Sequence, residues 1–144
     1  MSPVARLLGL AALLCALSPA ALADSHRQPA PAQARVYFIE PLDGASVAQT
    51  FTVKFGLKGM GVAPAGVDMP DTGHHHLLVD VETLPPLDAP LPATEQIRHF
   101  GKGQTETQLT LTPGSHTLQL LIGDKQHMPH AEPVISEKIS ITVQ

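Results

Sequence analysis

The stretch Phe51-Thr52-Val53-Lys54-Phe55-Gly56-Leu57 decides the fold, because large apolar residues alternate in it with polar or small ones. A period of two places successive side chains on opposite faces of a β-strand, so this stretch predicts a strand with one buried face. β-prone composition or the same alternation recurs at Val36–Ile39, Thr105–Leu111, His116–Ile122 and Ile135–Val143. No stretch after residue 23 keeps a helical period for more than a turn or two.

Turn-forming residues separate these segments. Pro41-Leu42-Asp43-Gly44 follows the first one, residues 58–72 are rich in glycine and proline, and Pro85, Pro86, Pro90 and Pro92 prevent regular structure until about Ile97. A loop over residues 123–133 precedes the last segment. We therefore expect an all-β domain, an immunoglobulin-like β-sandwich of about seven short antiparallel strands, over residues 35–144.

The first 23 residues have the pattern of a secretory signal peptide. Arg6 supplies a positive charge, Leu7–Leu17 form an apolar core too short to span a bilayer, and Ala21-Leu22-Ala23 is a small-x-small cleavage site. Residues 24–34 are polar and rich in proline, glutamine and alanine, which predicts a flexible N-terminal tail. We expect a periplasmic or secreted protein without membrane insertion.

Composition narrows the classes of function. The chain has 144 residues and one cysteine, Cys15, which lies in the predicted signal peptide, so the mature chain forms no disulfide and depends on its core, with or without a metal ion. The formal net charge is −4, and no basic run is present. This argues against a nucleic-acid or anionic membrane partner. The sequence assigns no oligomeric state.

A triple histidine lies in Gly73-His74-His75-His76-Leu77-Leu78-Val79-Asp80. Because side chains alternate along a strand, His74 and His76 share one face, whereas His75 shares the other with Leu77 and Val79. Histidine is the commonest metal ligand in proteins. The segment therefore supplies one pair of candidate ligands and one separate histidine, which makes half a metal site.

Other histidines can complete such a site if the chain brings them to this pair. We expect a metal centre of His74, His76, His99 and His127, with Met128, His130 and His26 as further candidate ligands. Imidazole ligands suit zinc or copper, and a methionine sulfur would favour copper. A mature chain beginning Asp24-Ser25-His26 would also have an amine, two amides and an imidazole spaced for square-planar Cu(II) or Ni(II).

The alternative is that the histidines form a structural hydrogen-bond network. His75 shares parity with apolar residues, and His116 shares it with Leu118 and Leu120, so both are expected to be structural. Asp80 is expected to orient a metal-binding histidine as an acceptor outside the ligand set.

Catalysis is the least supported class of function. The sequence has no nucleophile-elbow motif, and the mature chain has no cysteine. We expect a binding module rather than an enzyme. The alternative is a metal-dependent hydrolase, which would require an open coordination position and a general base. Expected partners are a metal ion or small ligand, or, for a structural domain, another protein of the cell envelope.

Several motifs resemble a bacterial exported domain family of unknown function, the one numbered 4399. The matching pieces are Pro41–Gly44, Phe55–Met60, Gly73–Asp80, Gly101-Lys102-Gly103-Gln104-Thr105-Glu106, Pro113–Leu120, and Gly123-Asp124 with His127. This resemblance covers Val36 to Val143 and implies an exported, immunoglobulin-like β domain. It implies no activity and assigns no role to any residue.

Overall fold

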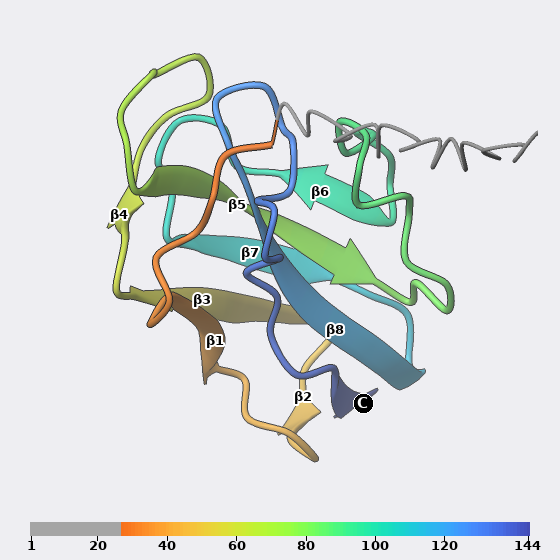
Figure 1. Ribbon diagram of the computed structural model, residues 1–144. Helices are drawn as coiled ribbons and strands as arrows, with labels where there is room; N and C mark the ends of the chain where they lie inside the picture. Colours follow the sequence, from red (N-terminus) through yellow and green to blue (C-terminus); the bar gives the residue numbers. More distant parts are fainter. Residues whose placement is uncertain (1–26) are drawn as a thin grey trace, which may run out of the picture.

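The structure, a computed structural model, describes residues 27–144, and all of their regular structure is β (Figure 1). The strands are β1 (Arg35–Glu40), β2 (Ser46–Val47), β3 (Thr50–Lys58), β4 (Gly61–Val62), β5 (Thr72–Val79), β6 (Ile97–His99), β7 (Glu106–Thr110), β8 (Gly114–Gly123) and β9 (Ile139–Val143). The predicted signal peptide, Cys15 and His26 lie outside the described residues. Within the described part of the chain, no helix is long and apolar enough to cross a membrane.

The smaller sheet has three strands in the order β1-β3-β7, and β3 is antiparallel to both of its neighbours. The alternation that predicted a strand at β3 also sets its faces. Val53 and Phe55 are buried, whereas Lys54 reaches Glu40 of β1 in an ion pair of 3.3 Å at the surface. The sheet therefore presents one apolar face to the interior.

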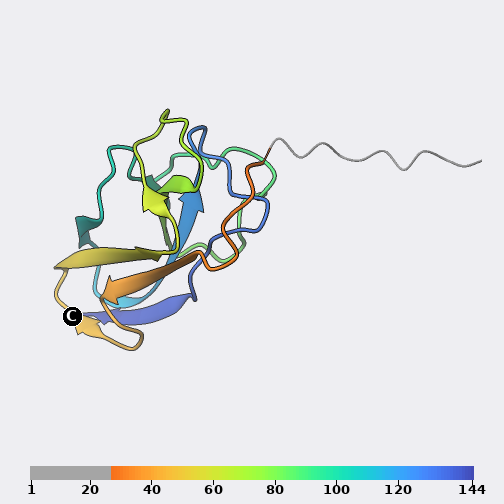
Figure 2. The same ribbon diagram turned by 60° about the vertical axis from the view of Figure 1, so that its left-hand side comes forward.

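The larger sheet has six strands, in the order β2-β9-β8-β5-β4, with β6 also paired to β5. Its centre is the antiparallel pair β5 and β8, in which His74 lies opposite Gly123 and Val79 opposite Leu118. Figure 2 shows the two sheets from a second angle. Two sheets without a helix among the described residues confirm the prediction of an all-β domain.

Two apolar clusters cover the two faces of β5. The main core between the sheets contains Val53, Phe55, Leu77, Leu120 and Ile122, together with Ala34, Val36, Val79, Phe100, Leu109, Leu118, Val134, Ile139, Ile141 and Val143. A smaller cluster of Leu78, Leu91, Ile97 and Leu121 lies on the opposite face of the larger sheet. The proline-rich segment after β5 thus covers the outer face of this sheet.

Four sequence expectations need correction. The described residues form nine strands rather than about seven, and two pairings, β2 with β9 and β4 with β5, are parallel. The last strand begins at Ile139 rather than at Ile135. β5 ends at Val79, because Asp80 has φ of 53°, a left-handed conformation that ends the strand. The tail predicted over residues 24–34 is described from residue 27. Its described part packs on the domain, since Ala34 is buried and the amide of Ala131 donates to the carbonyl of Gln28 at 2.8 Å.

Candidate metal centre

Four histidines from three separate parts of the chain meet on the outer face of the larger sheet. They are His74 and His76 of β5, His99 of β6 and His127 of the loop between β8 and β9, and we call them the histidine quartet. One ring nitrogen from each lies within 4.8 Å of the corresponding nitrogen of every other member. These are the four residues expected as ligands from the sequence.

Strand pairing brings three members of the quartet together. His74 and His76 lie two residues apart on β5 and so project from the same face. His76 pairs directly with His99 in the antiparallel register of β5 and β6, which places His99 on that face as well. The centroids of the three rings are 4.8 to 5.3 Å apart.

The fourth member comes from a tightly turned loop. His127 has φ of 65°, and its amide donates to the carbonyl of Asp124 at 2.9 Å. The Asp124 carboxylate accepts the amides of Gln126 at 2.8 Å and Met128 at 3.0 Å, while the amide of Leu91 donates to the carbonyl of His127 at 2.9 Å. The backbone of His127 is therefore fixed from both sides above the sheet.

Two glycines leave space for the rings of the quartet. A Cβ atom at Gly123 would lie 2.7 Å from Cε1 of His76 and 3.2 Å from the backbone of His127. A Cβ atom at Gly101 would lie 2.4 Å from the ring of His99. Sequence analysis attributed no role to either glycine in the site, because their closeness to the rings depends on strand pairing.

The buried nitrogens of the quartet are short of hydrogen-bond partners. His74 Nε2 lies 3.1 Å from His127 Nδ1, but His74 Nδ1 and both nitrogens of His76 have no hydrogen-bond partner among the described residues. His74 and His76 are fully buried, His127 is half-buried and His99 is exposed. Buried polar atoms are normally satisfied, so an unpaired group of this kind requires an explanation such as a bound ion.

Burial keeps the inner histidines neutral. Burial first, and then the charges of the neighbouring histidines, lower the pKa of His74 to about 4 and that of His76 to about 3. The pKa of His99 is also lowered, first by burial and then by His127. Metal binding requires neutral imidazole, so the inner pair is in its ligand form at neutral pH.

The other predicted histidines lie apart from the quartet. His75 faces the main core as its parity predicted, with its ring centroid 5.1 Å from that of Phe55. His130 is buried with both nitrogens unpaired, and its carbonyl accepts from Arg27. Met128 contributes its backbone to the Asp124 turn, and the candidate ligand His26 lies outside the described residues.

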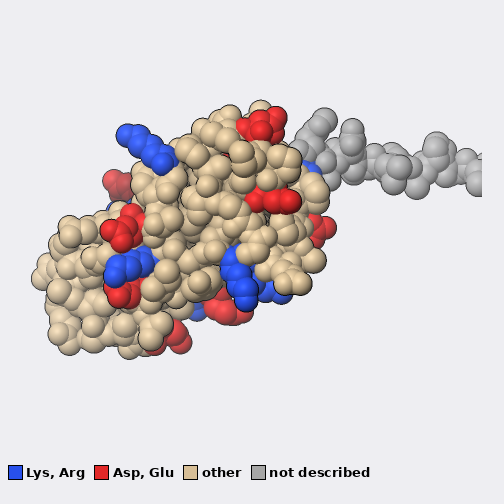
Figure 3. All heavy atoms as spheres, turned by 90° about the vertical axis from the view of Figure 1, so that its left-hand side faces the viewer, with Lys and Arg blue, Asp and Glu red and all other residues tan. Residues whose placement is uncertain are grey.

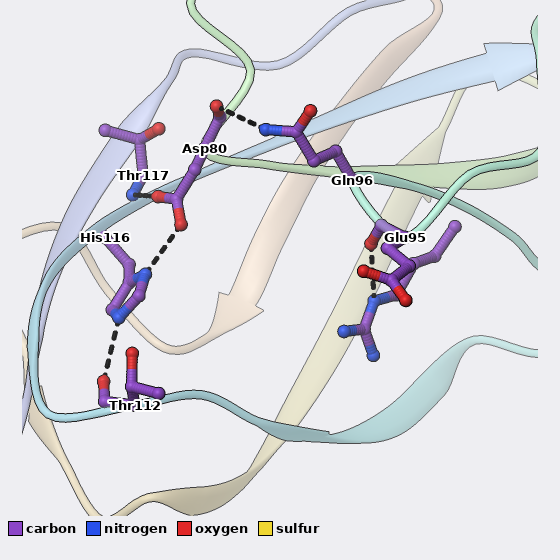
Figure 4. A network of polar contacts seen from close by, with 7 residues as sticks. Asp80, Glu95, Gln96, Thr112, His116 and Thr117 are labelled. Carbon is purple, nitrogen blue, oxygen red and sulfur yellow. Dashed lines mark hydrogen bonds and ion pairs between the residues drawn. The ribbon is translucent and has the colours of Figure 1, made fainter.

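Asp80 has a different partner from the one expected. Its carboxylate lies 2.7 Å from His116 Nδ1 and accepts the amide of Thr117 at 2.8 Å, while His116 Nε2 donates to the carbonyl of Thr112 at 2.8 Å (Figure 4). Asp80 thus orients a histidine at the far end of β5 rather than a member of the quartet. Asp80 follows the last residue of β5 and has a positive φ, so it is outside the strand that holds His74 and His76.

Three surface pockets, of about 240, 220 and 210 Å³, are lined by residues outside the quartet. The first of them is lined by Val36–Phe38, Pro41–Asp43, Ser136, Glu137 and Ile139. Acidic and basic side chains are interspersed on the face shown in Figure 3.

Comparison with known proteins adds the family. The model of the family described as domain of unknown function (DUF4399) matches residues 53–144. The chain belongs to this family. The matched region contains β5, β6 and the β8–β9 loop, and so the entire quartet.

The other comparisons add little. No curated protein matches the chain. Among solved structures, the endo-β-1,4-mannanase from Thermotoga petrophila is similar at 16% identity with a TM-score of 0.47, over 78% of this chain and 20% of the mannanase chain. At this level of similarity, nothing about the mannanase extends to this chain.

Proposed function

We propose that this protein is an exported binding module that holds one transition metal ion, copper or zinc, through His74, His76, His99 and His127. The observation that carries the proposal is the convergence of four imidazoles whose ring nitrogens lie within 4.8 Å of one another. In a tetrahedral site with ligands about 2.1 Å from the ion, the ligand nitrogens are about 3.4 Å apart. A pair of quartet nitrogens at the outer limit of 4.8 Å would therefore have to close by about 1.4 Å to bind one ion.

The chemistry of the four side chains supports the same proposal. Neutral imidazole suits zinc and copper, whereas magnesium and calcium prefer oxygen ligands. An ion would also give the unpaired nitrogens of His76 and His74 the partners that the protein does not supply. The outer members, exposed His99 and half-buried His127, leave a path for the ion from solvent.

The alternative is a structural or interaction domain of the cell envelope whose histidines form a hydrogen-bond network. His116 fits that description, because both of its nitrogens have partners. Within the quartet, one hydrogen bond joins His74 to His127 and the nitrogens of His76 have none. The metal proposal accounts for these unpaired atoms, and the network does not.

We assign binding rather than catalysis to the site. Metal sites filled by four protein ligands are typically structural, whereas catalytic zinc keeps one position open for water or substrate. A metal-dependent hydrolase is the alternative, and a substrate screen with turnover that is lost in His76→Ala would support it.

Two further parts of the proposal concern location and fold. The apolar stretch Leu7–Leu17 and the cleavage site at Ala21–Ala23 support export to the periplasm or beyond. We infer an immunoglobulin-like sandwich, because the orders β1-β3-β7 and β9-β8-β5 correspond to strands A-B-E and G-F-C of that fold.

The decisive experiment is metal analysis of untagged protein purified from the periplasm, followed by titration with Cu(II) and Zn(II). About one ion per chain is expected, with a rise in melting temperature of roughly 10 °C when the free ion is about 100-fold above its Kd. The double variant His74→Ala/His76→Ala should lose both effects.

His116→Gln is the matched control, because it removes a histidine of the same sheet that lies outside the quartet. It should bind the ion as the unmodified protein does. A metal-free protein whose melting temperature is unchanged by either ion would contradict the proposal.

A further inference from the structure

We infer that the quartet is a tetrahedral site and that its ion is Zn(II) rather than square-planar Cu(II). This inference rests on the proposed function and goes beyond it, because it selects one ion from the arrangement of the four rings. Zn(II) in sites filled by protein ligands is almost always tetrahedral, whereas Cu(II) favours square-planar or tetragonal nitrogen ligands. The arrangement of the rings therefore distinguishes the two ions.

The six distances between ring centroids indicate a tetrahedron. They run from 4.4 Å for His99–His127 to 5.8 Å for His76–His127. In a regular tetrahedron all six are equal, whereas in a square the two diagonals are about 1.4 times the sides, as a square-planar ion would require. With His76–His127 as one diagonal, the other is His74–His99, and its 4.9 Å lies among the remaining distances of 4.4 to 5.3 Å.

The fold explains why the rings are arranged in this way. His74, His76 and His99 project from one sheet face and form the base of the tetrahedron. His127 stands over this base on a loop fixed by Asp124 and Leu91, and its ring is nearly perpendicular to those of His74 and His76, at 84° and 88°. Flattening the four ligands into one plane would require this loop to move into the sheet.

The surroundings of the inner ligands oppose such a movement. Gly123 lies opposite His74 on β8, and a Cβ atom there would meet both the ring of His76 and the backbone of His127. The backbone of β5 is paired with β8 on one side and with β6 on the other. The two buried ligands are therefore held by the sheet, and the tetrahedron is a property of the fold.

Co(II) provides the direct test, because tetrahedral Co(II) absorbs visible light strongly and octahedral Co(II) absorbs weakly. The protein should be the untagged full chain with His26→Ala, since a terminus beginning Asp24-Ser25-His26 would bind Cu(II) or Ni(II) independently. We expect one Co(II) per chain with the intense tetrahedral spectrum and full displacement by one equivalent of Zn(II).

Two variants test whether the Co(II) spectrum comes from an ion bound by the quartet. His127→Ala should weaken and shift the Co(II) spectrum, because a solvent ligand replaces the imidazole above the sheet, and it should lower Zn(II) affinity at least tenfold. His116→Gln should retain the spectrum of the parent.

The outcomes separate this inference from the proposed function. Stoichiometric binding with a weak, octahedral Co(II) spectrum, or Co(II) that Zn(II) does not displace, would overturn the tetrahedral zinc site and leave metal binding intact. A chain that binds none of Co(II), Zn(II) or Cu(II) would overturn both.

Discussion

The two ends of β5 place histidines in opposite surroundings. At its start, His74 and His76 are buried, their pKa values are lowered, and three of their four nitrogens have no hydrogen-bond partner among the described residues. Just beyond its end, Asp80 lies 2.7 Å from His116, whose pKa is raised by this contact. Both nitrogens of His116 are bonded, one to a carboxylate and one to a carbonyl.

Hydrogen bonding therefore distinguishes His116 from the histidines of the quartet. A carbonyl accepts only, so Nε2 of His116 carries a proton, and the carboxylate at Nδ1 stabilises a second one. These contacts favour the imidazolium form of His116, which holds the turn after β5 to β8. The quartet has the reverse properties: burial lowers the pKa of His74 and His76, and three nitrogens of these two rings have no hydrogen-bond partner among the described residues. Unpaired nitrogens alone do not mark the proposed site, since His75 also lacks hydrogen-bond partners; their combination with the convergence of four rings does.

The largest expected effect comes from filling the space that Gly123 leaves in the quartet. Gly123→Ala should lower metal affinity roughly 100-fold, because the new Cβ would displace His76 or the His127 loop. Isothermal titration with Zn(II) measures this loss. Gly61→Ala is the control, since a Cβ there would meet a methyl of Thr72 at 3.3 Å and the carbonyl oxygen of Asp71 at 3.9 Å, both outside the quartet. Equal affinities for the two variants would show that the rings do not depend on this glycine.

Acid should destabilise the protein through histidines that the fold keeps neutral. Burial lowers the pKa of His75 to about 4, so between the ordinary value of 6.5 and 4 the unfolded chain binds the proton that the folded chain does not. This histidine alone should lower stability by roughly 2–3 kcal/mol as pH falls through that window.

His75→Phe removes this titration and should flatten the loss of stability in acid, which urea unfolding at pH 7.5 and 4.5 measures. Any packing cost of the larger ring is the same at both pH values and cancels in the difference. The same pH dependence in the variant and its parent would show that His75 is not held neutral.

Removing the negative charge of Asp124 beside the quartet should lower metal affinity less than filling the space at Gly123 does. Asp124 is buried, and its charge raises the pKa of His74, which means that it stabilises positive charge at that site. Asp124→Asn retains an oxygen acceptor for the loop amides but removes the charge, so we expect Zn(II) affinity to fall about tenfold. Asp124→Ala also removes the acceptor and should lower Zn(II) affinity further. Unchanged affinity in Asp124→Asn would assign Asp124 to the loop alone.

The smallest expected effect is at the other end of β5. The raised pKa of His116 adds stability that is full below pH 6.5 and is lost as pH rises through the folded value. His116→Gln should cost about 1 kcal/mol at pH 6 and less at pH 9, a modest figure because Asp80 is 42% exposed. Urea unfolding at the two pH values checks this. A cost that grows with pH would contradict the imidazolium assignment.

The sequence predicted what local pattern determines. Strand alternation placed His74 and His76 on one face and His75 on the other, and it predicted the buried residues of β3. The partner of Asp80 could not be predicted, because the contact depends on the left-handed turn after β5 and on pairing with β8. For the same reason, the position of Gly123 among the rings follows from the register of β8, which no local pattern reveals.

The quartet lies outside the main core, and this position determines whether folding depends on a bound ion. The residues packed between the sheets include none of its four histidines, so the sandwich has its apolar interior without an ion. Small zinc domains whose metal replaces a core fold only when it binds. Under the proposed function, folding would not depend on the ion, and the folded domain would take it up and release it in reversible exchange with the surrounding medium.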